Sequence, residues 1–305
     1  HFLLAERDGR IEGVLPLVRA SRIGRVALPS WHGWSHPNRF VGTPLVLAGA
    51  ALPFWRGLLA GLTHASPREL ALCLSDLALD DPVTQALFEV CAADGRTMAL
   101  DRRCARALLR PDDPPLVGAK QRRRIDSLLR KLARDLGPPK FRLIRDAEGI
   151  SARIAPFLEL EKSGWKGAGG SALACSEGNR SLFAAIVEAG AERGCCEMAE
   201  LSVGGRVLAL STQLLGNGRQ YGFKMAYDES CGTYAPGLLL LDWLTREHVA
   251  SGSSHPIDSC AAPDQMPVSR LWHHRCELID CRVAVGGSLR RGMMRTLLGG
   301  ELAYT

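Results

Sequence analysis

The sequence predicts a mixed α/β fold in two domains, each with a mixed, mostly antiparallel sheet flanked by helices. Short runs with strand-like alternation are interspersed with segments of helical periodicity along the whole chain. The length of 305 residues suits two domains, at roughly 150 residues each. A run of breakers at residues 111–115, PDDPP, separates the predicted domains, which are residues 1–115 and 116–305.

The first domain is predicted to begin with a β-hairpin. Residues 2–7 and 11–18 are strand-like, and Asp8-Gly9 between them is a strong turn signal. The later elements are a strand at 22–29, an irregular loop at 30–43, a helix at 53–64, a strand at 69–74, a helix at 81–93 and an extended segment at 97–109. The loop contains Trp31 and Trp34, which either pack over the sheet or line a cleft.

A strongly amphipathic helix is predicted at residues 118–136, where the second domain opens. Its apolar stripe repeats at helical spacing: Ile125, Leu128, Leu129, Leu132 and Leu136. Its other face is basic: Lys120, Arg122, Arg123, Arg124, Arg130, Lys131 and Arg134. Such a face is typical of a solvated helix, or of a surface that contacts the phosphates of RNA or of a nucleotide-bearing cofactor.

The remaining elements follow without a long interruption. They are a strand at 140–145, a helix at 150–163 capped by Ser151, a glycine-rich loop at 164–170, a helix at 179–193, strands at 196–203, 206–215 and 220–228, a helix from Pro236, a strand at 256–260, a helix at 266–273, a strand at 278–285 and a basic tail at 286–300. Gly204-Gly205 and Asn217-Gly218 separate the three central strands, so we expect an antiparallel meander.

Residues 220–249 combine a strand, a polar turn and a helix. Alternation in the strand predicts one face with Lys224 and Asp228 and another with aromatic and apolar side chains: Tyr221, Phe223, Met225 and Tyr227. Pro236-Gly237 opens the helix, because Pro suits a first helical turn. Free N–H groups and the positive end of the helix dipole make this turn a candidate anion site, although most such units bind nothing.

Composition places the chain among ordinary globular proteins, with 46% hydrophobic and 23% charged residues. No apolar run approaches the roughly 20 residues of a membrane span. The net charge of +6 is compatible with an anionic ligand without demanding nucleic acid. Ten scattered cysteines without a CxxC pair indicate reduced thiols in a cytoplasmic protein, and we expect no metal site. The chain opens inside a predicted strand without an initiator Met, so we expect residues before His1.

Four short phrases in the second domain carry a family resemblance: LELEKSGWKG at 158–167, KMAYDE at 224–229, YAPGLL at 234–239 and IDSCA at 257–261. Together with the order of elements, they resemble the GNAT acyltransferases of the CelD-like group, which is associated with bacterial cellulose and polysaccharide biosynthesis. This group is similar to the Fem-type aminoacyl transferases, which pair two GNAT folds in one chain. The resemblance covers residues 118–285, and the first domain fits a partner GNAT-like domain in general pattern.

The resemblance implies transfer of an acyl group from acetyl-CoA or another acyl-CoA to an amine or hydroxyl. In a GNAT fold the pantetheine arm of the cofactor lies between two splayed strands, which here are 220–228 and 256–260. The residues that would bind the cofactor are Tyr234, Pro236, Gly237 and Leu238. N–H groups of this turn would contact its phosphates. The usual GNAT turn has Arg or Gln and two glycine positions, whereas this turn has a single Gly, so aminoacyl-tRNA stays open as the donor.

Acyl transfer needs a base for the nucleophile, a stabiliser for the oxyanion and a proton for the leaving thiolate. The candidate catalytic residues are Lys224, Tyr227, Asp228 and Asp258. Either carboxylate would take the proton of the acceptor. Lys224 would stabilise the oxyanion or neutralise an acidic acceptor, and Tyr227 or Tyr234 would protonate the thiolate. The structural alternatives are a Lys224–Asp228 ion pair and a loop cap at Asp258.

Trp165 and Lys166, in the glycine-rich loop, are the candidate substrate-binding residues. Cys260 is interpreted as a buried thiol, because no His is placed by sequence to activate it as a nucleophile. The sequence thus predicts a tandem GNAT acyltransferase that acts on a small-molecule, glycan or peptide acceptor in polysaccharide or cell-envelope biosynthesis. The alternatives are an aminoacyl transferase that uses charged tRNA and a non-catalytic GNAT-like binding module.

Overall fold

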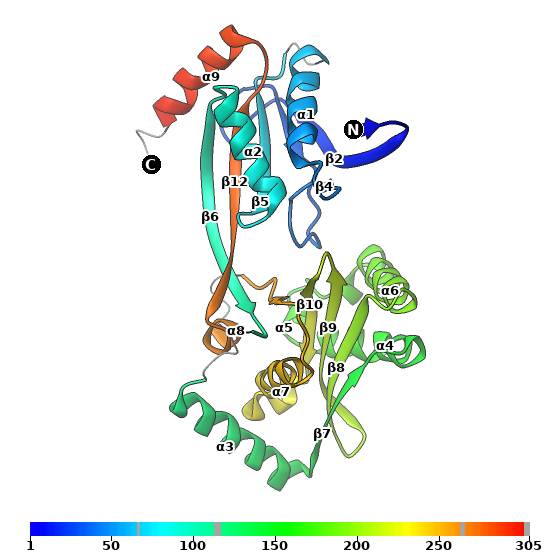
Figure 1. The fold of residues 1–305 in the computed structure, drawn as a ribbon. Coiled ribbons are helices and arrows are strands. Elements are labelled where there is room, and N and C mark those ends of the chain that lie inside the picture. Colours follow the sequence, from blue (N-terminus) through cyan, green and yellow to red (C-terminus); the bar gives the residue numbers. More distant parts are fainter. Residues whose placement is uncertain (66–67, 113–116, 263–265, 302–305) are drawn as a thin grey trace. The chain divides into compact units, whose positions relative to one another are not determined.

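The structure is a computed structural model that describes residues 1–65, 68–112, 117–262 and 266–301 (Figure 1). It has the predicted mixed α/β fold, with sheet strands flanked by helices. The chain forms two compact units, one of His1–Ala105 with the segment from Cys276, and the other of Arg106–Arg275. The predicted domain boundary between residues 115 and 116 lies outside the described residues, so a division at that point stays a prediction.

The first unit is built on strands in the order β1-β2-β3-β5-β12-β6, with β4 paired to β2. These strands are β1 (Phe2–Arg7), β2 (Arg10–Ala20), β3 (Ser30–Gly33), β4 (Leu45–Val46), β5 (Ala71–Ala78), β6 (Met98–Leu109) and β12 (His274–Ala284). Its helices are α1 (Ala51–Ala65), α2 (Pro82–Ala93) and α9 (Ser288–Glu301). The predicted β1–β2 hairpin is confirmed, and Asp8 and Gly9 both take the positive φ angles of a tight hairpin turn.

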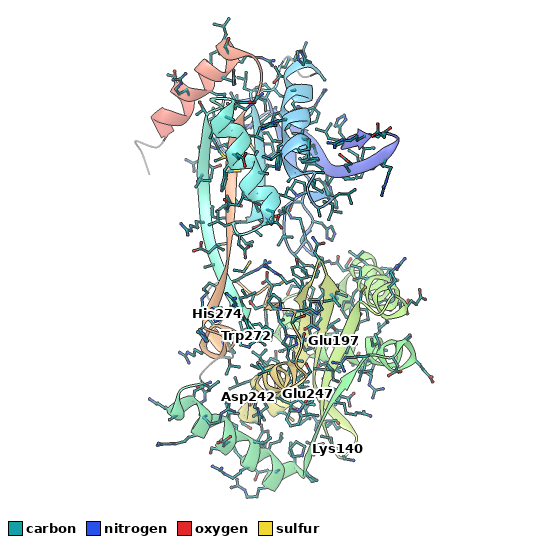
Figure 2. The ribbon with its side chains drawn as sticks, in the orientation of Figure 1. Lys140, Glu197, Asp242, Glu247, Trp272 and His274 are labelled. Carbon is teal, nitrogen blue, oxygen red and sulfur yellow. The ribbon has the colours of Figure 1, made fainter. Side chains whose placement is uncertain are left out.

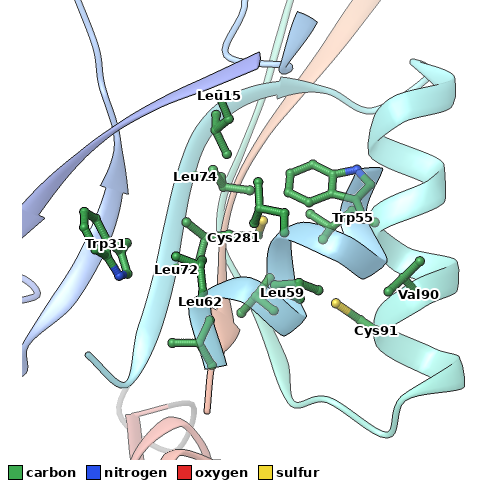
Figure 3. Packing of buried hydrophobic residues seen from close by; sticks show 14 of the residues in the cluster. Leu15, Trp31, Trp55, Leu59, Leu62, Leu72, Leu74, Val90, Cys91 and Cys281 are labelled. Atoms are coloured by element: carbon green, nitrogen blue, oxygen red, sulfur yellow. The ribbon is translucent and has the colours of Figure 1, made fainter. Parts of the chain in front are cut away.

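The core of this unit lies between the sheet and helices α1 and α2 (Figure 3). Trp55 of α1 is fully buried and donates its indole N–H to the carbonyl of Val83 at 2.7 Å. Leu72 of β5 and Cys281 of β12 pack in the same cluster. Removal of apolar surface from water is the main force that favours folding, so the packing of this cluster holds the two helices on the sheet.

One strand of the first unit differs from the prediction. The sequence predicts a strand at residues 22–29, but these residues turn back through an isolated bridge between Ile23 and Val26. The strand is instead β3, inside the predicted loop, where it pairs with β2 on one side and β5 on the other. Trp31 of β3 is 4% exposed, so it packs in the core. This strand forms because β2 and β5, which are distant in sequence, pair with it, and a local sequence pattern carries no information about such partners.

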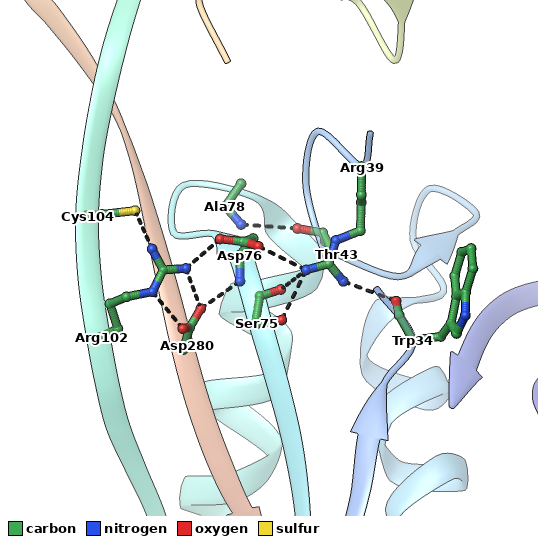
Figure 4. Close-up of polar contacts among 9 residues, drawn as sticks. All are labelled: Trp34, Arg39, Thr43, Ser75, Asp76, Ala78, Arg102, Cys104 and Asp280. Atoms are coloured by element: carbon green, nitrogen blue, oxygen red, sulfur yellow. Dashed lines mark hydrogen bonds and ion pairs between the residues drawn. The ribbon is translucent and has the colours of Figure 1, made fainter. Parts of the chain in front are cut away.

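Where β5 extends past β3, other segments of the chain bond to its free edge. The two strands are parallel neighbours over three residue pairs. Beyond them, the Gly42 N–H donates to the carbonyl of Asp76 at 2.7 Å. Arg39 and Arg102 also bind the carboxylate of Asp76, at 2.9 and 2.5 Å (Figure 4). This edge of β5 is therefore occupied by protein atoms.

The second unit is built on strands in the order β6-β11-β10-β9-β8-β7, with antiparallel neighbours apart from the β10–β11 pair among its described strands. Its further strands are β7 (Pro139–Ile144), β8 (Cys196–Val203), β9 (Arg206–Gly216), β10 (Arg219–Tyr227) and β11 (Ile257–Asp258). Helices α3 (Ala119–Leu136), α7 (Pro236–Ala250) and α8 (Met266–Leu271) cover one face. Helices α4 (Ala147–Ser163), α5 (Trp165–Ala168) and α6 (Glu177–Glu192) cover the other, with the short turn η1 (Leu173–Cys175).

Three local predictions for this unit are corrected. Asp146, not Ser151, caps α4, because its carboxylate accepts the Gly149 N–H at 2.6 Å. The predicted glycine-rich loop contains the one-turn helix α5, which packs closely on the end of α4. A Cβ at Gly167 would lie 1.7 Å from the carbonyl oxygen of Lys162, so a larger residue does not fit there. The polar turn after β10 is a 3-10 helix, η2 (Glu229–Tyr234).

Glu200 on β8 is a buried charge that stabilises the second unit. It is 1% exposed and accepts hydrogen bonds from Arg142 at 2.6 Å and Arg153 at 2.8 Å. Burial alone would raise the pKa of Glu200, but these hydrogen bonds outweigh it and hold the pKa below its usual value. The stabilisation is therefore present above the pKa of an unfolded Glu and is lost as the pH falls through the lower folded pKa.

We expect Glu200→Gln to lower the free energy of unfolding at neutral pH by about 2 kcal/mol, because two charge-assisted hydrogen bonds are weakened. Urea unfolding at neutral pH and near the acid end of the stable range would measure this. The difference from the wild type should shrink in acid. Glu177→Gln, at an exposed pair with Arg180, is the control and should change the free energy by no more than about 0.5 kcal/mol. Equal effects of both substitutions would contradict the prediction.

Candidate active site

The parallel strands β10 and β11 separate after two residue pairs, Gln220–Ile257 and Tyr221–Asp258. At the point of separation the backbones are in contact, since a Cβ at Gly222 would lie 2.9 Å from the carbonyl oxygen of Ser259. The chain after β11 then turns toward β6, where the Ser259 N–H donates to the carbonyl of Ala107 at 3.0 Å. Among the described residues no strand continues along this edge of β10. The predicted strand at 256–260 is only Ile257–Asp258, so its ladder with β10 ends where β11 ends. We call the unpaired edge of β10 after Gly222 the opening between β10 and β11, in contrast to the closed edge of β5.

A β-bulge in β10 lies at this opening. The pairing with β9 shifts between Gly222 and Lys224, so Phe223 is an additional residue. The register then puts Lys224 on the same face as Tyr221, and Met225 and Tyr227 on the other face. The predicted alternation, which grouped Tyr221 with Met225 and Tyr227, is wrong from the bulge onward. One extra residue reverses which way every later side chain points.

Helix α7 begins against one face of β10, next to the side chains of Met225 and Tyr227. Ala235, just before it, has a φ of 50°, a left-handed conformation that is unfavourable for a residue with a Cβ. Pro236 has no N–H, and the Leu238 N–H donates to the carbonyl of Ala235 at 3.0 Å. The Gly237 N–H has no acceptor among the described residues. Of the predicted phosphate-binding turn, Gly237 thus supplies the free backbone donor.

Gly237 also contacts the end of β10. A Cβ built on it would lie 3.3 Å from Cδ1 of Tyr227 and 3.5 Å from Sδ of Met225. This contact places Tyr227 next to the start of α7, on the α7 face of the sheet. The side chain of Tyr227 is partly exposed. The structure brings together these two predicted residues, one for the cofactor and one for proton transfer.

Tyr234 connects the same turn to the basic helix α3. Its hydroxyl donates to a carboxylate oxygen of Asp135 at 3.3 Å, and the Lys131 ammonium lies 5.1 Å from the centre of its ring. Asp242 of α7, labelled in Figure 2, forms an ion pair at 2.9 Å with Arg122, near the other end of α3. The exposed cations of α3 are Lys120, Arg123, Arg124, Arg130 and Arg134. A positive surface thus adjoins the start of α7.

Lys224 lies on the opposite face of β10, beside α4 and α5. Its ammonium is 5.5 Å from the centre of the Phe223 ring. Burial and then the neighbouring charge of Lys166 lower the pKa of Lys224, and Glu161 opposes this. Lys166 forms an ion pair with Glu161 at 2.7 Å. Within the part of the chain that the structure describes, Lys224 has no carboxylate within 4.0 Å, so the predicted alternative of an ion pair with Asp228 is not formed.

Asp228 closes the end of β10. The carboxylate of Asp228 accepts a hydrogen bond from the backbone N–H of Ser230 at 3.0 Å and thereby caps η2. The same carboxylate forms an ion pair with Arg206. Burial would raise the pKa of Asp228, but hydrogen bonds from Ser230 and Arg206 outweigh it and lower the pKa. A carboxylate with a lowered pKa is a weaker base, so this environment favours a charged, structural group.

Asp258 is 0% exposed and lies at the end of β11. It is paired with Arg106 at 2.6 Å and accepts the Cys260 N–H at 3.0 Å. Cys260 has a φ of 49°, so the carboxylate caps a turn in a left-handed conformation. This geometry agrees with the loop-cap alternative.

Trp165 and Lys166 both belong to α5. Trp165 is 63% exposed. The backbone N–H of Trp165 donates to a carboxylate oxygen of Glu229 at 2.8 Å, which ties α5 to η2. Glu161, which anchors Lys166, is missing from the predicted site. It continues the apolar stripe of α4 at helical spacing after Phe157 and Leu158, and a carboxylate on such a stripe is the signal that could have found it.

The site residues lie on the two faces of β10. Tyr227 and Gly237 lie on the α7 face, and Lys166 and Lys224 lie on the α4 face. Among the described residues, no group of three or more His, Cys, Asp or Glu side chains is arranged to hold a metal ion. None of the described helices has the length and apolarity needed to cross a bilayer.

Comparison with known proteins finds a match for the segment that contains this site. Residues 119–262 match the family model described as acetyltransferase (GNAT) domain. A search of curated proteins finds no match for the chain.

Solved structures share the fold over almost the whole chain. The C-terminal domain of an Agrobacterium fabrum protein described as a lysylphosphatidylglycerol synthetase has a TM-score of 0.56 at 12% identity and covers 97% of this chain and 87% of that one. L-PGS from Bacillus licheniformis has a TM-score of 0.52 at 9% identity, with 98% and 88% covered. FemX has a TM-score of 0.51 at 12% identity, with 92% and 87% covered. At these identities the likeness shows the fold alone.

Proposed function

We propose that the second unit is an acyltransferase that uses acyl-CoA as its donor and an amine or hydroxyl as its acceptor. The observation that carries the proposal is a strand, β10, with an edge that lacks a strand partner after Gly222 and with the start of α7 against its end, within residues that match a GNAT domain. The free Gly237 N–H and the positive end of α7 would bind the phosphates of the donor. The thioester arm would lie along the edge of β10 that β11 leaves open.

The predicted catalytic residues receive unequal support. Tyr227 lies on the face of Gly237 and would donate a proton to the leaving thiolate. Lys224, half-buried beside the bulge, would act on negative charge at the acceptor side of the opening. Asp228 would take the proton of the nucleophile through water, although its ion pair with Arg206 makes it a weak base. Asp258 would hold the turn after β11 through Arg106 rather than meet the substrate.

The finer setting rests on the phrases at residues 158–167, 224–229, 234–239 and 257–261. Their resemblance to the CelD-like group supports a role in polysaccharide or cell-envelope biosynthesis. The acceptor would then be a glycan, a peptide or a small molecule carrying an amine or hydroxyl.

Calorimetric titration with desulfo-CoA tests the proposal. We expect saturable binding at one site per chain, and similar binding of acetyl-CoA and a longer acyl-CoA. Desulfo-CoA avoids a thiol-release assay, in which an exposed protein thiol such as Cys175 could mimic turnover. A lack of binding by all three ligands would refute acyl-CoA as the donor. Binding without transfer to any acceptor would point to a non-catalytic module.

An aminoacyl-tRNA donor is the second candidate, and the exposed cations of α3 favour it. They lie along the helix whose last turns contact Tyr234 through Lys131 and Asp135, just before the start of α7. Binding of tRNA through this surface would weaken steeply with salt, because each phosphate contact releases counterions. Replacement of Lys120, Arg123 and Arg130 by Gln should reduce that salt dependence. If desulfo-CoA binds and tRNA does not, this candidate is excluded.

A further inference from the structure

The cluster around Lys224 holds more positive than negative charge. Glu161 of α4 has a side chain that is 3% exposed, and both of its carboxylate oxygens are used. Oε1 accepts from the Lys166 ammonium at 2.7 Å, and Oε2 accepts the Leu173 N–H at 2.8 Å. This buried carboxylate is thus committed to Lys166. Lys224 has no anionic partner of its own among the described residues.

A second polar group beside Lys224 also lacks a partner. Thr212 of β9 is the cross-strand neighbour of Lys224 and shares its face of the sheet. It is fully buried, and among the described residues its hydroxyl has no hydrogen-bond partner. Buried polar groups are usually satisfied, and an exception needs an explanation such as a ligand. Lys224 and Thr212 are paired residues on one face of the sheet. An ammonium and a hydroxyl that both lack a partner have the donors that an oxyanion accepts from.

We infer that Lys224 and Thr212, with Lys166 beside them, form a subsite for an oxyanion of the acceptor, which is a carboxylate or a phosphate. The inference rests on the proposed acyltransferase function and names the chemistry of its acceptor. The subsite lies on the α4 face of β10, immediately after the bulge, whereas Gly237 lies on the α7 face. The acceptor's anion and the donor's phosphates are thereby held on opposite faces of the strand. The nucleophile of the acceptor meets the thioester at the opening between β10 and β11.

The uncompensated charge also explains why the site accepts an anion in preference to a neutral group. A partly desolvated ammonium without a counter-ion is unfavourable, and an incoming oxyanion relieves that cost. The committed geometry of Glu161 prevents this carboxylate from turning to Lys224 instead. Exposed Trp165, at the start of the same short helix as Lys166, offers an apolar surface beside the subsite.

Nuclear magnetic resonance of the full chain with isotopically methylated lysines tests the subsite directly. The Lys224 signal is assigned by its loss in Lys224→Met, and acetate and phosphate are titrated separately. We expect a saturable shift of the Lys224 signal with at least one anion. The anion that binds more tightly shows whether the subsite prefers a carboxylate or a phosphate. Lys140, exposed on β7, is the control and should show no saturable shift (Figure 2). No saturable shift at Lys224 with either anion would overturn the inference.

Thr212→Val provides a variant that is expected to fold. Valine has nearly the same shape, and loss of a buried hydroxyl without a partner should leave the melting temperature unchanged or raise it. We expect the affinity for the anion to fall by about fivefold, as for one lost hydrogen bond. Unchanged affinity would remove Thr212 from the subsite. Titration of the same samples with desulfo-CoA separates the two proposals, because failure of the donor site would abolish that binding and leave the Lys224 shift intact.

Discussion

Gly237→Val is expected to weaken the binding of desulfo-CoA by at least about tenfold, the effect of one lost charge-assisted hydrogen bond. A Cβ at this position would lie 3.3 Å from Cδ1 of Tyr227, and the two methyl groups of valine extend beyond it. The start of α7 must therefore move away from β10, and the free N–H moves with it. Calorimetric titration measures the loss, and thermal unfolding checks that the fold is retained.

Gly178 offers a matched control for this substitution. It occupies the second position of α6, as Gly237 occupies the second position of α7. It is exposed, and a Cβ there would meet only Oγ of Ser176, at 3.9 Å. Gly178→Val should bind desulfo-CoA like the wild type. If Gly237→Val also binds like the wild type, the start of α7 is not the phosphate site.

Lys224→Met is expected to lower kcat/KM by about a hundredfold for an acceptor that carries a carboxylate. Methionine keeps the apolar stem against Phe223 and removes the charge that the oxyanion of the acceptor needs. Acyl transfer from acetyl-CoA to an amino acid and to its amide, followed by mass spectrometry, measures the effect on a charged and a neutral acceptor. We expect the amide to lose far less than the acid.

The same pair of acceptors separates two roles of Lys224. If Lys224 stabilised the oxyanion of the reaction itself, the acid and the amide would lose turnover equally, because the reacting carbonyl is the same. That result would assign Lys224 to the chemical step and remove it from acceptor recognition. Lys162→Met, an exposed lysine at the end of α4, should leave both reactions unchanged.

The order of most elements could be predicted from the sequence. Asp8-Gly9 and Asn217-Gly218 both take the positive φ angles of tight hairpin turns, and they set the strands on either side. The basic helix at 118–136 is present as α3, with Ile125 and Leu132 buried. These features depend on residues a few positions apart, so interactions within each segment provide nearly all the free energy that favours them.

The partners of the site residues were decided by the tertiary structure. The bulge at Phe223 put Lys224 on the face of Tyr221 and separated Tyr221 from Tyr227, and that bulge depends on pairing with β9 and on the approach of β11. Lys224 lies near Lys166 and Glu161 instead of pairing with Asp228, because α4 and α5 pack on its face of the sheet. The sequence alone determined which elements form and in what order. Which side chains meet was decided by contacts between distant segments, since their free energy exists only once the sheet and its helices have assembled.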